Sequence, residues 1–484
     1  MKFSKRFLHG SIFGASLFII LCTVSTFGCA DSVNESKSPF ANSSIKFWLS
    51  DPSQNLKFEE RSTGVNTITI SSAPTITIDA QITYQEMDGF GFALTGGSAM
   101  LINNMSPSAR SNLLTELFDV SGNNIGTSYL RVSIGASDLD EKVFSYNDLP
   151  SGQTDVDLTQ FTLEEDRNHL IPVLKEILAI NPNLKIMGSP WSAPTWMKTN
   201  NNSVGGSLKT QYYDVYAQYF VRYIEEMAKE GITIDAITVQ NEPLHPGNNP
   251  SMYMTANEQA VFIGGSLGPA FENAGISTKI ICYDHNADRT DYPITVLSDP
   301  EANKYVDGSA FHLYGGTIDQ LSTVHNTFPN KNIYFTEQWV GAPGDFPNDL
   351  KWHINTLIIG GARNWCKTVI EWNLAADENQ DPHTPGGCTS CLGALTINGD
   401  QIVRNPAYFI IAHAAKFVRP GSKRIDSNEP TGLSNVAFKT KDNKTVLIVL
   451  NNGDSEQAFN ISIGDQTVSS KLSAGAVGTY VFPY

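Results

Sequence analysis

Two glutamates, Glu242 and Glu337, follow short apolar stretches and end the motifs Gln240-Asn241-Glu242 and Phe335-Thr336-Glu337. Two carboxyl groups on separate, facing segments suit the hydrolysis of a glycosidic bond. One group must protonate the leaving oxygen while the other attacks the anomeric carbon, and retention of configuration requires roughly 5–5.5 Å between them. Taken singly, each glutamate is also open to interpretation as a buried structural carboxylate. Taken together, in these contexts, the pair predicts glycosidase chemistry.

Further polar and aromatic residues stand directly after apolar stretches. They are Arg131, Ser137, Asp138, Trp191, Asn241, Asp284, His285, Asn286, His312, Tyr314, Gln338, Trp339, Trp372 and Asn373. Indole faces can form apolar walls for a pyranose ring, although core packing is the alternative for each Trp. These residues hold no dense Asp/His set with metal-ligand spacing. We predict no metal and no other cofactor, because two carboxylates suffice for this chemistry.

Eight apolar stretches in the middle of the chain alternate with helical patterns. Strands are predicted over residues 89–94, 128–133, 185–189, 236–240, 279–283, 308–312, 332–336 and 368–372. Helices are predicted over residues 108–118, 164–179 and 212–229. This order is typical of an α/β fold, the (β/α)8 TIM barrel, whose active site forms at the carboxyl ends of the strands. The strands before Glu242 and Glu337 are the fourth and seventh, which face each other across the ring.

Both ends of the chain carry alternating β-type patterns, at residues 45–49, 67–70 and 75–78 and again at residues 433–438, 445–450 and 477–482. We predict one side β-sandwich domain built from both chain termini. Its N-terminal part covers residues 45–80, the catalytic barrel covers 81–404, and residues 405–484 hold the last barrel helix and the C-terminal part of the sandwich. The sandwich is open to interpretation as a carbohydrate-binding module, but a structural brace is the simpler interpretation.

The first residues predict export. A positive start, an apolar run and small residues before Cys29 are typical of a lipoprotein-type signal peptide over residues 1–29. We expect lipidation at Cys29, a flexible tether over residues 30–44 and anchoring to a bacterial membrane, at the cell surface or in the periplasm. Ordinary cleavage nearby, giving a free product, is the alternative.

The composition and net charge limit the classes of partner that the chain is expected to bind. The 484 residues are 41% hydrophobic and carry a formal net charge of −16 without basic clusters. The chain is therefore globular, and it offers no electrostatic reason to bind nucleic acid or anionic lipid. We expect a monomer that meets the membrane only through its lipid anchor.

Two cysteines form the motif Cys388-Thr-Ser-Cys391 beside Gly386 and Gly387. A zinc site would need two more ligands, and no second such pair exists. In an oxidising compartment a local disulfide between Cys388 and Cys391 is favoured over free thiols.

Several motifs, spread in order over the barrel, resemble glycoside hydrolase family 30, the glucosylceramidase-like enzymes. They are the stretches 89–95, 130–135, 188–198, 238–243, 335–337 and 372–374. The resemblance implies retention of configuration, with Glu242 as acid/base and Glu337 as nucleophile. It also implies that the first sugar is surrounded by Arg131, Trp191, Asn241, His312, Tyr314 and Trp372. Asn373, directly after Trp372 at the end of the eighth strand, is predicted to bind substrate as well.

The resemblance implies an Asp after the Gly-Phe-Gly stretch, which in many members binds hydroxyls of the terminal glucose. This chain has Gly96 in that place, followed by Gly97. We expect the glycine pair to leave space for a bent or longer glucan. The family includes endo-β-1,6-glucanases, so β-1,6-glucan is the favoured substrate over a glucosylceramide-like glycoside, with xylan third. A non-catalytic surface glycan-binding lipoprotein is the alternative outside the enzymes.

Overall fold

The computed structural model describes residues 45–483. The predicted signal peptide, the lipidation at Cys29 and the tether over residues 30–44 lie outside the described residues. Within the described part of the chain, no helix is long and apolar enough to span a bilayer.

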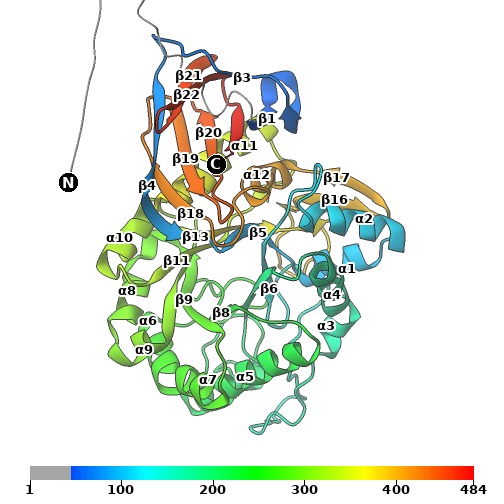
Figure 1. The fold of residues 1–484 in the computed structure, drawn as a ribbon. Helices are drawn as coiled ribbons and strands as arrows, with labels where there is room; N and C mark the ends of the chain where they lie inside the picture. The colour runs from blue at the N-terminus through cyan, green and yellow to red at the C-terminus, as the bar shows by residue number, and fades with distance from the viewer. Residues whose placement is uncertain (1–44, 484) are drawn as a thin grey trace, which may run out of the picture. The chain divides into compact units, whose positions relative to one another are not determined.

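A closed barrel of eight parallel strands forms the middle of the chain, in the order β10-β11-β13-β5-β6-β7-β8-β9 (Figure 1). The strands are β5 (Gly89–Ala93), β6 (Tyr129–Ser133), β7 (Lys185–Ser189), β8 (Ala236–Thr238), β9 (Lys279–Asn286), β10 (Val306–His312), β11 (Asn332–Glu337) and β13 (Cys366–Asn373). Every predicted barrel strand is present. The fourth ends at Thr238 rather than at residue 240, and the fifth continues to Asn286.

Side-chain alternation along the strands builds the interior of the barrel in layers. One buried apolar layer consists of Tyr129, Met187, Ala236, Ile281, Ala310, Tyr334 and Ile370. Two residues further along several of these strands, the same inward-facing positions hold Arg131, Ser189, Thr238, His312, Thr336 and Trp372. The sequence thus changes from an apolar to a mainly polar layer toward the carboxyl ends of the strands.

Helices cover the outside of the barrel. They are α1 (Gly96–Asn103), α2 (Pro107–Phe118), α3 (Glu164–Asn168), α4 (Leu170–Ile180), α5 (Tyr213–Lys229), α6 (Ala256–Phe262), α7 (Gly268–Ala274), α8 (Asp291–Ser298), α9 (Pro300–Tyr305), α10 (Gln320–Thr327), α11 (Phe346–His353) and α12 (Pro406–Ala415). The single helix predicted over residues 164–179 was wrong, because the backbone leaves the helical region at His169 (φ −139°) and divides it into α3 and α4.

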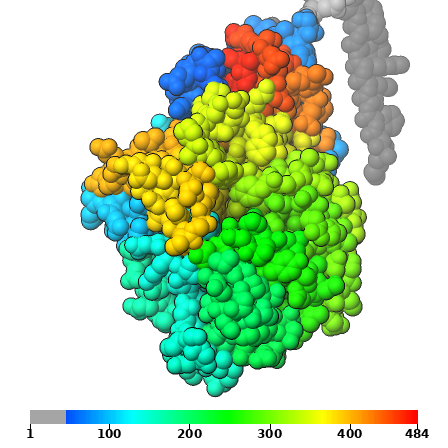
Figure 2. Space-filling view, turned by 180° about the vertical axis from the view of Figure 1, so that it is seen from behind, coloured from blue at the N-terminus to red at the C-terminus, as the bar shows by residue number. Residues whose placement is uncertain are grey.

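Strands from both chain ends form one sheet in the order β2-β1-β23-β20-β19-β18-β4-β21-β22-β3, at one end of the molecule (Figures 1 and 2). The strands are β1 (Lys46–Asp51), β2 (Leu56–Arg61), β3 (Val65–Asn66), β4 (Thr75–Glu86), β18 (Lys423–Ser427), β19 (Leu433–Lys439), β20 (Thr445–Asn451), β21 (Gln457–Ile463), β22 (Gln466–Leu472) and β23 (Val477–Phe482). The long strand β4 pairs with β21 through its first residues and with β18 through the rest. It therefore joins the two layers of the sandwich.

Two expectations for this region were wrong. Residues 81–86 belong to the sandwich, since β4 continues its pairing with β18 to Glu86 instead of ending near residue 80. Residues 67–70 form no strand, because the side chains of Asn460 and Ser469, rather than a neighbouring strand, bind the main chain of Ile68 and Ile70.

A buried histidine joins barrel and sandwich. The ring of His413 on α12 hydrogen-bonds through Nδ1 to the Thr479 hydroxyl (2.9 Å) and through Nε2 to the Ser50 hydroxyl (2.8 Å). Ser50 lies on β1 and Thr479 on β23, so one side chain ties the helix to both chain ends. Burial lowers the pKa of His413 to about 3, and the ring stays neutral in the folded protein.

We expect the His413→Gln variant to be less acid-sensitive than the wild type. Below the unfolded pKa near 6.5, the unfolded chain binds a proton at His413 that the folded protein does not. The free energy of unfolding therefore falls as the pH falls toward 3, by up to about 1.4 kcal/mol per pH unit. Urea unfolding of both proteins at pH 7 and pH 4.5 measures the difference. Equal losses in both proteins would contradict this assignment, and exposed His245→Gln is the matched control.

Candidate active site

The carboxyl ends of the barrel strands hold a buried hydrogen-bonded network around Asp284, on β9. Its carboxylate accepts from Arg131 (2.8 Å), Thr238 (2.7 Å) and Thr336 (2.6 Å) and contacts His312 Nε2 (3.1 Å). Although burial opposes ionisation, the Arg131 charge and the donated hydrogen bonds hold the pKa of Asp284 well below its usual range. Asp284 thus provides a fixed negative charge that orients the side chains of Arg131 and His312.

Glu337 ends β11 and is held by two donors. Arg131 Nη1 donates to Glu337 Oε2 at 2.6 Å, and the Tyr314 hydroxyl donates to Oε1 at 3.0 Å. Both arrangements favour the ionised carboxylate, since an arginine cannot give up its proton. Arg131 is fully buried and also donates to Asn241 Oδ1 at 2.7 Å. Its buried charge is balanced by the carboxylates of Asp284 and Glu337.

Glu242 follows β8 in a left-handed backbone conformation, φ +44°. A non-glycine residue in this region is strained, and such strain persists where the surrounding structure fixes it, commonly at functional sites. Here the Glu242 amide donates to the Asp284 carbonyl at 3.0 Å, and Pro243 follows directly. The side chain is turned toward His312, whose Nδ1 lies 3.2 Å from Glu242 Oε1.

The two glutamates lie close together. One oxygen of Glu242, one oxygen of Glu337 and a ring nitrogen of His312 all lie within 4.8 Å of one another. Three such atoms can in principle hold a cation. Here Arg131 already donates a hydrogen bond to Glu337, and the other ring nitrogen of His312 contacts Asp284. An added metal ion would therefore compete with the positive charge of Arg131. The arrangement can deliver a proton and a nucleophilic oxygen to one small volume.

Opposing influences set the charges of this group. Burial favours neutral His312, but the charge of Glu337 and hydrogen bonds with Asp284 and Glu242 raise its pKa to about 10. Burial by itself acts to raise the pKa of both glutamates, but the net shifts differ. For Glu242 the hydrogen bond and charge of His312 outweigh burial and lower the pKa, whereas for Glu337 burial prevails over His312 and Arg131.

A cavity of about 370 Å³ opens over the glutamates, within the usual size of small-molecule sites. Its lining is Asp138, Trp191, Asn241, Glu242, His245, Asn248, His285, Asn286, Tyr314, Glu337, Trp339, Trp372, Cys388 and Cys391. The rings of Trp191 and Trp372 stack with centroids 5.4 Å apart, and the Arg131 guanidinium lies 4.9 Å from the Trp191 ring. Among residues 45–483, Trp191 Nε1 and His285 Nδ1 are buried and find no hydrogen-bond partner. Both atoms are free to pair with hydroxyl groups of a bound ligand.

The structure brings most of the predicted site residues together. Trp191, Asn241, Tyr314 and Trp372 line the cavity with the glutamates, while Arg131 and His312 are fully buried and hold the glutamates in position. Asn373 does not line the cavity. It faces α1, where its Oδ1 accepts a hydrogen bond from the Ser98 hydroxyl at 2.9 Å.

Some other lining residues were predicted to lie at strand ends, but no role was predicted for them. Asp138 is one of them, five residues after β6 and only 6% exposed. Burial and the charge of Glu337 raise its pKa to about 7. A buried carboxyl group on the cavity wall is well suited to accept hydrogen bonds from sugar hydroxyls.

The expectation that Gly96 and Gly97 leave space for a longer glucan was wrong. A Cβ atom at Gly96 would lie 1.6 Å from Asp140 Oδ1, and one at Gly97 would lie 2.6 Å from both the Leu139 carbonyl and Pro382 Cγ. The Asp140 carboxylate, held by Ser137 (2.7 Å), fills the volume that a side chain at position 96 would take. Both glycines are required by close packing, and neither lines the cavity.

The sequence matches two family models, the glycosyl hydrolase family 30 TIM-barrel domain over residues 87–418 and the family 30 β-sandwich domain over residues 421–480. The chain belongs to glycosyl hydrolase family 30. It is a glycoside hydrolase, and the predicted barrel with a side β-sandwich is confirmed as the fold of this family.

Relatives of this family 30 chain include two kinds of enzyme. The endo-1,6-β-D-glucanase neg1 of Aspergillus fumigatus is 35% identical over 82% of this chain and 85% of its own length. The lysosomal acid glucosylceramidase of Mus musculus is 30% identical over 84% and 83%. Among solved structures, the endo-β1,6-glucanase BT3312 superposes with a TM-score of 0.84 at 33% identity, over 91% of this chain and all of that chain.

Proposed function

We propose that this family 30 enzyme cleaves β-1,6-glucan with retention of configuration, through a covalent glycosyl-enzyme intermediate. The observation that carries the mechanism is the separation of the two glutamates, whose nearest oxygens lie within 4.8 Å. This separation suits direct attack by one carboxylate, whereas an inverting pair needs room for a water molecule, roughly 6.5–9.5 Å. We infer the substrate from the relatives, three of which are endo-1,6-β-D-glucanases at 34–36% identity.

In the first step the Glu337 carboxylate attacks the anomeric carbon and Glu242 protonates the departing glycosidic oxygen. Arg131 and Tyr314 donate to Glu337 and hold it as an oriented anion. In the second step Glu242, now ionised, removes a proton from water, and the water oxygen displaces Glu337 from the sugar. Each step inverts the anomeric carbon, so the product keeps the β configuration.

The proton must reside on Glu242 when substrate is bound. In the unliganded site His312 lowers the pKa of Glu242 and burial raises that of Glu337, so the proton is favoured on Glu337 rather than on Glu242. We expect the bound sugar to reverse this order. A glycosidic oxygen beside Glu242 displaces water and favours its neutral form, while Glu337 keeps Arg131 and Tyr314 as donors.

The rim of the cavity suits a chain longer than one sugar. Tyr314 is 42% exposed although its hydroxyl reaches Glu337, and half-buried Trp339 lines the same cavity. Aromatic faces at a rim offer stacking surface to further glucose units. This exposure favours attack within a glucan, the activity in the names of the fungal relatives, over removal of a terminal glucose.

The test is the product profile on linear β-1,6-glucan, beside a glucosylceramide and an aryl β-glucoside. We expect early release of a range of oligosaccharides from the glucan, whose new reducing ends appear first as the β-anomer by proton NMR. Glucose alone, released from the lipid or the aryl glucoside, would instead indicate the glucosylceramidase-like activity named for the other relatives. An α-anomer as first product would contradict the retaining mechanism.

We further propose that the enzyme works outside the cytoplasm, anchored through Cys29. The motif before Cys29 supports this location, as does a disulfide in the cavity wall, since such bonds persist in oxidising compartments.

A further inference from the structure

One loop, Thr384–Cys391, contacts three of the loops that form the active-site face, and we call it the disulfide loop. The Thr384 amide donates to the Asp138 carbonyl at 2.9 Å, and Asn249 donates to the Pro385 carbonyl at 3.0 Å. Ser390 accepts from the Ala342 amide at 2.9 Å, beside the pairing of β12 (Val340–Gly341) with β15 (Cys391–Leu392). These partners follow β6, β8 and β11; Glu242 also follows β8, and Glu337 ends β11. Figure 2 shows this yellow segment beside the cyan and green ones.

Cys388 and Cys391 are joined by a disulfide, and both line the cavity. Cys391 is buried in a cluster with Trp191 and Trp372, and Trp339 and Cys388 pack against the same cluster. Sulfur atoms are polarizable and make favourable contacts with aromatic rings. The disulfide is therefore part of the same apolar wall as the stacked indoles.

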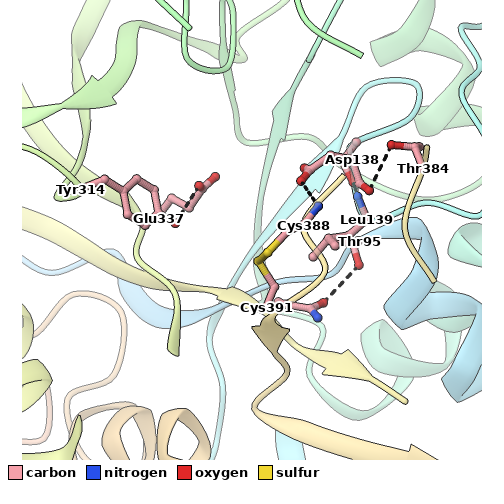
Figure 3. The surroundings of a disulfide bond; sticks show 10 residues. Thr95, Asp138, Leu139, Tyr314, Glu337, Thr384, Cys388 and Cys391 are labelled. Atoms are coloured by element: carbon pink, nitrogen blue, oxygen red, sulfur yellow. Dashed lines mark hydrogen bonds between the residues drawn. A yellow bond between two sulfur atoms is a disulfide. The ribbon is translucent and has the colours of Figure 1, made fainter. Parts of the chain in front are cut away.

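The same disulfide fixes a donor to the buried carboxyl group of the cavity. The Cys388 amide donates to Asp138 Oδ2 at 3.3 Å, while Thr384 binds the main chain of Asp138 from the start of the loop (Figure 3). The bond closes a short ring within the main chain, so the position of the Cys388 amide depends on it. Two separate thiol groups cannot approach as closely as two bonded sulfurs, and their Cβ atoms must move apart.

We propose, on the basis of the proposed function, that the Cys388–Cys391 disulfide is a positioning element for sugar binding. It keeps the Cys388 amide on Asp138, so that this carboxyl group is set for the sugar hydroxyls. A dithiol reductant supplies two electrons and two protons, the S–S bond becomes two thiols, and the reductant is oxidised to its own disulfide. Reduction then weakens substrate binding and leaves the chemistry on Glu242 and Glu337 intact. Cys388 is half-buried, so a small reductant can reach it.

The test measures KM and kcat on linear β-1,6-glucan before and after dithiothreitol, and in the Cys388→Ser/Cys391→Ser double variant. We expect KM to rise about tenfold on losing a hydrogen bond to a buried carboxyl group, with kcat changed less than about twofold. The double variant should match the reduced enzyme and should ignore reductant. It retains the buried thiols of Cys282 and Cys366 and is therefore the control for other effects of the reagent. Melting temperatures establish that each protein is folded.

The Asp138→Ala background, which lacks an acceptor oxygen for the Cys388 amide, tests the route of the effect. Because the disulfide acts through Asp138, breaking it in this background should raise KM by less than about twofold, a non-additive result. A fall in kcat at constant KM would assign the bond a merely structural role and overturn the inference. So would an equal rise in KM in both backgrounds, or an active wild type whose KM ignores reduction. A folded wild type that hydrolyses no β-glucoside would overturn the proposed function itself.

Discussion

Replacing Glu337 by alanine is expected to lower kcat/KM on β-glucosides by about 10⁴-fold or more, because the variant lacks the oxygen that forms the covalent intermediate. The vacated volume should admit azide as an external nucleophile. With a 2,4-dinitrophenyl β-glucoside, azide would attack once from the face that Glu337 used and give the α-glucosyl azide. Product configuration by NMR checks the assignment, because a single displacement inverts the anomeric carbon.

Activity above about one hundredth of wild type, or a β-configured azide product, would contradict the role of Glu337. The matched control is Glu165→Gln, a half-buried glutamate that pairs with Lys142 at 2.8 Å and does not line the cavity, and this variant should retain wild-type activity.

The Glu242→Gln substitution is expected to lower kcat on β-1,6-glucan by about 10²–10⁴-fold, the usual contribution of a general acid or base. A dinitrophenolate leaves without protonation, so on the activated glucoside the first step should survive. The second step lacks its base, and the intermediate should accumulate as a burst of dinitrophenol followed by slow turnover. Azide should relieve the slow step and give the β-glucosyl azide, since two displacements then occur. Equal losses on both substrates, without a burst, would contradict the acid/base role.

Much of the fold was predictable because its signals are local. Each barrel strand is a short apolar run whose inward positions alternate, and the helices between them carry a 3.6-residue pattern. The helix break at His169 and the extension of β4 to Glu86 depend on neighbours in space, and no feature within their own segments marks them. The paired glutamates were predictable for a related reason, because a (β/α)8 barrel brings every strand end to one face.

The part of the site that the sequence did not predict depends on loops. Asp138 gains its importance from burial, from Glu337 across the barrel and from a peptide of the disulfide loop 250 residues later. Asn373 ends its strand beside Trp372, yet a bond to Ser98 turns it out of the cavity. At Gly96 the sequence indicated open space, whereas the Asp140 carboxylate fills it. Each case required the distance between residues that lie far apart in the chain.

The position of β23 has a consequence for how the polypeptide matures. This strand is made late, yet it lies between β1 and β20 in the sheet, where it pairs with both. Some 426 residues separate the end of β1 at Asp51 from Val477, which corresponds to about 20–85 s of ribosomal elongation. During that interval the edge of β1 that pairs with β23 in the folded protein is open and can pair with other chains. Closure of the sandwich, and with it the anchoring of α12 through His413, must therefore follow chain completion, and a nascent chain needs its early strands shielded until then.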